Sequence, residues 1–167
     1  MAEMEIDRDL QNKIMHGYRG AANLFRAMVE ELEARYGREV AWDIGRAVVR
    51  KKGLWAGELA AQTAGTGGLS NLARAHRANY ANVEVSELSE TRYGVIDHRC
   101  AIVEAWRDAG LSPERVKELA DLYCWGDLAF AQAFNPNIEL EFLSRIAEGA
   151  PKCHWLYSLK RPSESPA

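Results

Sequence analysis

The spacing of the apolar residues changes near residue 81, and this change limits the folds open to the chain. Before that point apolar side chains recur every three or four positions, most regularly from Asp7 to Tyr36, which predicts a long amphipathic helix. Gly17 and Gly20 lie within it, where a break or kink is expected. Further helical segments are predicted up to Gly53, over 54–62 and over 71–80, and His16 and His76 are expected on solvated helix faces.

Beyond residue 81 apolar and polar residues alternate, as in strands that bury one face. This pattern predicts a hairpin over 81–89 and 91–98, and two later strands over Ile138–Phe142 and Cys153–Leu159. Helices are expected in between, one over 100–109 and one from the N-cap Ser112 to Phe134. The expected fold is α+β: an antiparallel sheet of about four strands covered by helices, with an N-terminal helical layer.

The chain length and composition fit one globular domain. A chain of 167 residues suits a single hydrophobic core, so residues 1–160 are predicted to form one α+β domain, and residues 161–167 a disordered tail. A net charge of −3 favours no nucleic-acid partner. The polar, acidic N-terminus and the lack of a long apolar run predict a cytoplasmic protein with no membrane association, and the long first helix makes a homo-oligomer plausible.

The chain has three cysteines, Cys100, Cys124 and Cys153, which we expect to be free thiols in a reducing compartment. Cys100 lies at the start of a predicted helix, where the helix dipole would lower its pKa. Cys124 and Asp127 are three residues apart on a helix and so share a face. For each cysteine the alternative is a structural role, because free cysteine is among the most buried residue types.

Other candidates surround the cysteines. His154 is a candidate base, although strand alternation directs it away from Cys153 and towards the opposite face. His98 is close in sequence to Cys100, but adjacent residues rarely face each other. Tyr123 and Trp155 are expected in the core or in the wall of a small-molecule pocket.

The sequence favours no cofactor. The cysteines are 24 and 29 residues apart and lack the paired spacing of structural zinc sites, so zinc held by the three thiols is only a minority alternative. The chain also lacks the phosphate-binding glycine motif and the HExxH and GxSxG motifs.

Three segments together resemble a known family. HRCAIVEAWRDAGL, LYCWGDLAFAQAFNPNIELEF and EGAPKCHWLYSL are similar to the pattern of the L-2-amino-thiazoline-4-carboxylic acid hydrolase family, over roughly the C-terminal 70 residues. In that pattern a cysteine opens a helix, a second stands in C-x-x-D before Asn135-Pro136, and a third follows a glycine turn. Ala101 and the pair His154-Trp155 depart from the residues common in the family, and they mark where substrate preference would differ.

The resemblance implies a thiol-dependent hydrolase that opens a small nitrogen-containing ring, or cleaves a C–N bond, of a cyclic amidine, imine or thiazoline. The implied catalytic residues are Cys100, Cys124, Asp127, Cys153 and His154. The implied substrate-binding residues are His98, Tyr123, Asn135 and Trp155. The alternative is a non-catalytic small-molecule or metal-binding domain that retains the family's pocket.

Overall fold

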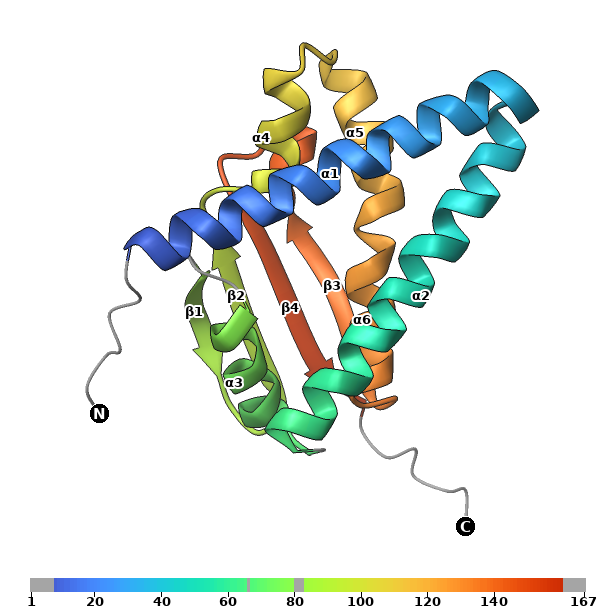
Figure 1. Ribbon diagram of the computed structural model, residues 1–167. Coiled ribbons are helices and arrows are strands. Elements are labelled where there is room, and N and C mark those ends of the chain that lie inside the picture. The colour runs from blue at the N-terminus through green and yellow to red at the C-terminus, as the bar shows by residue number, and fades with distance from the viewer. Residues whose placement is uncertain (1–7, 66, 80–82, 161–167) are drawn as a thin grey trace.

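The computed structural model describes residues 8–65, 67–79 and 83–160, and it has the predicted α+β architecture (Figure 1). The helices are α1 (Arg8–Tyr36), α2 (Arg38–Ala64), α3 (Leu69–Asn79), α4 (Ala101–Asp108), α5 (Pro113–Tyr123) and α6 (Trp125–Phe134). The strands are β1 (Val83–Leu88), β2 (Arg92–Asp97), β3 (Ile138–Ser144) and β4 (Cys153–Leu159), with a 3-10 turn η1 (Ile146–Glu148) before β4. The tail predicted for 161–167 lies outside the described residues.

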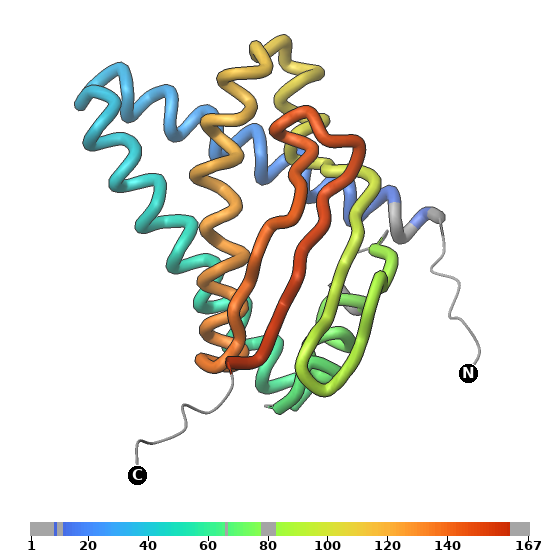
Figure 2. The backbone as a smooth tube through the Cα atoms, turned by 180° about the vertical axis from the view of Figure 1, so that it is seen from behind, coloured from blue at the N-terminus to red at the C-terminus, as the bar shows by residue number. Residues whose placement is uncertain are grey.

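The four strands form one antiparallel sheet in the order β1-β2-β4-β3. Helices cover only one of its faces; seen from behind, no described helix crosses the sheet (Figure 2). On the covered face, α3 and α6 pack against a row of side chains from β2 and β4 that includes Tyr93, Val95 and Tyr157. This alternation is the one predicted from the sequence, and it assigns every second residue of β4 to the core.

The two long helices are continuous where the sequence suggested interruptions. Gly17 and Gly20 lie on an open side of α1, where a Cβ added to either residue would meet no atom within 4 Å, so nothing forces a kink there. The segments predicted to end at Gly53 and to cover 54–62 form the single helix α2. A Cβ on Gly53 or Gly57 would overlap a backbone carbonyl of α6, so these glycines allow two helices to approach closely and do not mark a helix end.

One histidine prediction is wrong. His76 on α3 is buried, not solvated; its ring stacks on Phe130 with centroids 5.4 Å apart and lies against the rings of Tyr93 and Tyr157. Burial lowers the pKa of His76 to about 3, so the imidazole is neutral at physiological pH. It acts as an aromatic core residue, which the polar residues around it in sequence did not indicate.

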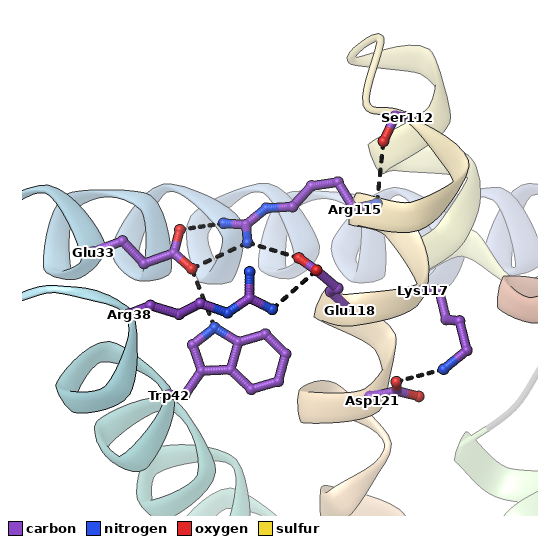
Figure 3. A network of polar contacts seen from close by, with 8 residues as sticks. All are labelled: Glu33, Arg38, Trp42, Ser112, Arg115, Lys117, Glu118 and Asp121. Atoms are coloured by element: carbon purple, nitrogen blue, oxygen red, sulfur yellow. Dashed lines mark hydrogen bonds and ion pairs between the residues drawn. The ribbon is translucent and has the colours of Figure 1, made fainter.

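A network of charged residues joins the α1–α2 connection to α5 (Figure 3). Glu33 on α1 accepts hydrogen bonds from both Nη atoms of Arg115 and from Trp42 Nε1, at 3.1 Å for the indole. Glu118 also accepts from Arg115 and pairs with Arg38 at 2.9 Å. The predicted N-cap of α5 is confirmed, since Ser112 Oγ accepts from the backbone N–H of Arg115. These contacts hold α5, and the cysteine at its end, against α1.

Candidate functional site

The three cysteines line one cavity of about 110 Å³ at the end of the sheet where α1, α4 and α5 meet. α4 contributes Cys100, the α5–α6 junction contributes Cys124, and the first residue of β4 is Cys153. The predicted residues Asp127, Tyr123 and Trp155 lie in the same wall. The other lining residues come from α1, α2, α4, α5 and η1, from the end of β2 and from the connections after β2 and β3: Ile14, Met15, Tyr18, Lys52, Asp97, Arg99, Ala101, Ile102, Val103, Ala120, Arg145 and Ala147.

Cys100 is the N-cap residue of α4, as the sequence indicated, but its electrostatics are opposite to the expectation. Its carbonyl accepts the first helical hydrogen bond, from Glu104 N at 2.9 Å. Burial raises the pKa of the Cys100 thiol to about 12, and the neighbouring Cys153 and Asp97 add to this rise. The helix terminus therefore does not offset the loss of solvation, and the resting thiol is protonated.

Cys124 and Asp127 meet at the start of α6. The backbone N–H of Asp127 donates to Cys124 O at 3.1 Å, and both side chains line the cavity. Burial raises the pKa of the Asp127 carboxyl to about 6, partly opposed by the Lys52 ammonium, and burial together with Asp127 raises the pKa of Cys124. The Asp127 carboxyl makes no hydrogen bond within the described part of the chain, so its oxygens are available to a ligand.

Cys153 has a different environment. Its sulfur accepts a hydrogen bond from the backbone N–H of Ile146 at 3.3 Å, a contact that favours the thiolate and partly opposes the rise in pKa due to burial. Across the β2–β4 ladder its direct partner is Asp97, the last residue of β2. Burial raises the pKa of the Asp97 carboxyl to about 6, while Asp97 Oδ1 accepts from Arg99 N at 3.0 Å. A thiol and a carboxyl thus share one corner of the cavity.

Three cations line the wall, Lys52, Arg99 and Arg145, and Arg99 pairs with Glu104 at 2.9 Å. Lys52 Nζ donates to the Tyr123 hydroxyl at 2.8 Å and lies over the Tyr123 ring. Arg145 pairs with Asp121 at 2.6 Å and with Glu148 at 2.5 Å, so its charge is balanced by two carboxylates that do not line the cavity. Lys52 lies close enough to Asp127 to lower the pKa of that carboxyl. Among the described residues Lys52 forms no ion pair with a carboxylate, so the charge of Lys52 can act on Asp127 or on a bound anion.

Three predicted site residues lie outside the cavity. His154 is on the uncovered face of β4, where its Nε2 lies 3.1 Å from Ser86 Oγ. His98 is exposed and pairs with Glu84 at 3.0 Å. Asn135 caps the loop after α6: its Nδ2 donates to Gly67 O at 3.0 Å and its Oδ1 accepts from Asn137 N. Strand alternation explains the position of His154, and local turn bonds explain that of Asn135.

Asp97, Lys52 and Arg145 line the cavity but were not predicted from the sequence. Asp97 had a signal, because it shares the alternating face of Tyr93 and Val95 and is therefore an acidic residue on an apolar strand face. Lys52 precedes Gly53, where a helix was predicted to end, but α2 continues to Ala64 and Lys52 lies mid-helix in the cavity wall. Arg145 lies in a short connection before η1, where single-sequence patterns carry no information on side-chain direction.

Over residues 8–65, 67–79 and 83–160, no three His, Cys, Asp or Glu side chains are grouped so that they could hold a metal ion. Within these same residues, no helix is long and apolar enough to cross a bilayer.

The fold is α+β, and the cysteine-lined cavity at the end of its sheet is the candidate site. The family model described as L-2-amino-thiazoline-4-carboxylic acid hydrolase matches residues 17–157, and the chain belongs to this family. A search of curated protein sequences gives no significant match.

Two solved structures share the fold at low sequence identity. One is a trafficking protein particle complex subunit 3 from Naegleria fowleri covalently bound to palmitic acid, with a TM-score of 0.58 and 14% identity over 87% of this chain and 96% of that one. The other is the phenol-responsive sensory domain of the transcription activator PoxR with phenol, with a TM-score of 0.50 and 14% identity over 83% of this chain and 73% of that one. At this identity the likeness concerns the fold alone.

Proposed function

We propose that the protein is a thiol-dependent hydrolase that opens a small nitrogen-containing ring, such as a cyclic amidine, imine or thiazoline. The observation that carries the proposal is the convergence of three thiols and two carboxyls, Asp97 and Asp127, on one cavity. Family membership supports hydrolysis of a thiazoline. The two structural neighbours, solved with phenol and with covalently bound palmitic acid, support a fold that accommodates small or covalently attached ligands.

Cys153 is the nucleophile in this proposal. A thiol that is protonated at rest needs a base to attack, and Cys153 is the cysteine directly opposite a carboxyl, Asp97, in the sheet. The hydrogen bond from Ile146 N stabilises the thiolate as it forms. With a pKa of about 6, Asp97 is largely ionised at neutral pH and can accept the proton.

Asp127 acts on the other side of the ring. In the form in which Asp127 is protonated, the Cys153 proton passes to Asp97 as the sulfur–carbon bond forms at the amidine carbon, and Asp127 protonates the ring nitrogen, so that the C=N bond becomes a single bond. This C–N bond then breaks as the ring nitrogen takes a second proton from the exocyclic amino group, which becomes a C=NH group on the same carbon, and the amine is released. Water adds to that carbon and gives one proton to the C=NH nitrogen. The sulfur–carbon bond breaks as the sulfur recovers its proton from Asp97 and the new hydroxyl gives its proton to Asp127, which leaves a C=O group and returns both carboxyls to their starting forms. The net change is the addition of one water across the C–N bond.

The experiment measures turnover of 2-aminothiazoline-4-carboxylate by the wild type and by Cys153→Ser, Cys100→Ser and Cys124→Ser. We expect Cys153→Ser to lose about 10³-fold or more in kcat, and the other two to lose less. Mass spectrometry of wild-type protein quenched during turnover should show a substrate adduct on the peptide containing Cys153. Unchanged turnover in all three variants would exclude thiol catalysis.

A second candidate is a non-catalytic domain that binds a small molecule. The observation in its favour is that burial raises the pKa of all three thiols, as expected for a packed cavity wall. This candidate predicts that the serine variants change ligand affinity or thermal stability without any turnover to lose. No metal or organic cofactor is part of either proposal.

A further inference from the structure

A second, larger depression adjoins the cysteine cavity. It has a volume of about 520 Å³, compared with about 110 Å³ for the cavity, and it lies on the helix-covered side between α1, α2 and α3 with α6 beneath it. Four residues line both spaces: Tyr18, Lys52, Tyr123 and Asp127. The reactive carboxyl of Asp127 thus stands in a wall shared by the cavity and this groove.

The groove is apolar beyond that shared wall. Its outer lining comes from α2, α3 and α6: Trp55, Ala56, Leu59, Ala60, Ala75 and Phe130. Thr63 is its one further side chain with a hydroxyl, and this hydroxyl donates to Leu59 O and Ala60 O, so it offers no unused donor. Apart from the Trp55 indole N–H and the Thr63 hydroxyl oxygen, the polar partners for an occupant lie at the end nearest the cysteines.

The walls of the groove are held at a fixed separation. α2 contacts α6 through glycine, since a Cβ on Gly53 or Gly57 would overlap the carbonyl oxygens of Gly126 and Phe130. The two helices have no room to move closer, and the groove does not depend on a mobile loop. The rim of the groove exposes apolar side chains to water: Trp55 is 67% exposed and Leu59 is 47% exposed. Exposed apolar surface of this kind is unfavourable in water and often marks a binding site.

We propose that this groove binds an apolar arm of the substrate, a phenyl-sized or branched aliphatic substituent, while the nitrogen-containing ring occupies the cysteine cavity. The proposal rests on the proposed function for the identity of the ring. The volume lies within the range of about 300–1,000 Å³ typical of small-molecule sites, and the shared wall joins it to the reactive groups. Its preferred substrates are larger and more apolar than an unsubstituted thiazoline.

Binding is measured by calorimetry, so that the result does not depend on catalysis. The probes are 2-aminothiazoline and a 2-aminothiazoline carrying a phenyl substituent. In the wild type and in Cys153→Ser we expect the phenyl compound to bind about 10-fold or more tightly than the parent, from the burial of one aromatic ring. Equal affinity for the two probes would overturn the proposal.

Ala56→Phe fills the groove and should remove this preference, while the affinity for the parent compound stays within about twofold. Ala47→Phe is the matched control, because Ala47 is exposed on the same helix and does not line the groove. Leu59→Asp is a second variant at an exposed position, where folding is less affected, and it should also remove the preference. A preference that survives both groove variants would contradict the assignment.

Two outcomes separate this inference from the proposed function. If the cysteine variants turn over both compounds unchanged while the phenyl preference depends on Ala56, thiol catalysis fails and the groove assignment stands. If the groove is instead covered by a second copy of the chain, sedimentation will show a dimer in the wild type that Ala56→Phe or Leu59→Asp dissociates. That result would overturn the assignment of a substrate arm.

Discussion

Asp97 and Cys153 are direct partners in the β2–β4 ladder, and both side chains line the same cavity. Directly opposed residues on one face of an antiparallel pair have Cβ atoms about 4.5–5.5 Å apart, which allows proton exchange through small side-chain movements or one water. Asp97 is the last residue of β2 and Cys153 is the first residue of β4. Their pairing is therefore set by the register of the sheet and not by a flexible loop.

Replacing Asp97 tests its role as the base. In Asp97→Asn we expect kcat to fall about 10²–10⁴-fold with little change in KM, because the amide cannot accept the thiol proton. The acidic limb of the wild-type pH profile of kcat/KM, centred at about pH 6, should be lost in the variant. Glu84→Gln is the control, since Glu84 pairs with exposed His98 away from the cavity. A normal acidic limb in Asp97→Asn would assign it to another group.

Asp127 gives a stability prediction that needs no substrate. Its pKa is raised from 3.8 to about 6 by burial, so its contribution to folding is greatest below the unfolded-state pKa and is lost as the pH rises through about 6. Asp127→Asn should therefore be more stable than the wild type by about 1–3 kcal/mol at neutral pH, and the difference should vanish below about pH 4. Urea unfolding across this range measures it.

The control for that series is Asp43→Asn, at an exposed position on α2. It should show no comparable gain in stability at neutral pH. A wild-type protein that is more stable than Asp127→Asn at neutral pH would mean that the Asp127 carboxylate has a stabilising partner in solution, and the proposed availability of its oxygens would be wrong.

Replacing glycine by alanine should have opposite effects on stability in α1 and in α2. Gly57→Ala would place a methyl group 2.8 Å from Ala133 Cβ and in overlap with the Phe130 carbonyl, and should destabilise the protein by about 2 kcal/mol or more. Gly20→Ala on α1 meets no atom within 4 Å and should stabilise it by up to about 1 kcal/mol. Thermal and urea unfolding distinguish the two. Equal effects would contradict the close approach of α2 and α6.

The Glu33–Arg115 pair should contribute measurably because both side chains are largely shielded (Figure 3). Hydrogen bonding to Arg115 lowers the pKa of Glu33, so the contribution is present at neutral pH and is lost as the pH falls through the folded-state pKa. Arg115→Met should cost about 1–3 kcal/mol at neutral pH and clearly less in acid. Lys13→Met removes an exposed ion pair with Asp9 and should cost less than about 0.5 kcal/mol.

Much of the fold could be predicted from periodicity alone. The alternation of Tyr93, Val95 and Asp97, and of Cys153, Trp155 and Tyr157, gave the strands and their buried faces, since the period of two is a direct property of extended backbone. The helix interruptions at Gly20 and Gly53 were wrong for a physical reason. A glycine has the same sequence signal whether it ends a helix, stands on a solvent face or permits a close helix contact.

The site could be predicted only in part. The helix start and the C-x-x-D spacing identified Cys100, Cys124 and Asp127, because those signals are local. The pairing of Asp97 with Cys153 depends on strand register between segments more than fifty residues apart, which a single sequence does not specify. The sign of the Cys100 pKa shift was wrong because burial depends on the packing of α1 over α4, a tertiary feature.

The burial of the three thiols also affects how they react with oxidants and alkylating agents. Thiolates are the forms that peroxide and alkylating agents attack, and burial keeps Cys100, Cys124 and Cys153 in the thiol form at rest. Such a site is protected from adventitious oxidation and modification while it is empty. Reactivity would then be confined to the moments when a bound ring and a neighbouring carboxylate together draw off the proton.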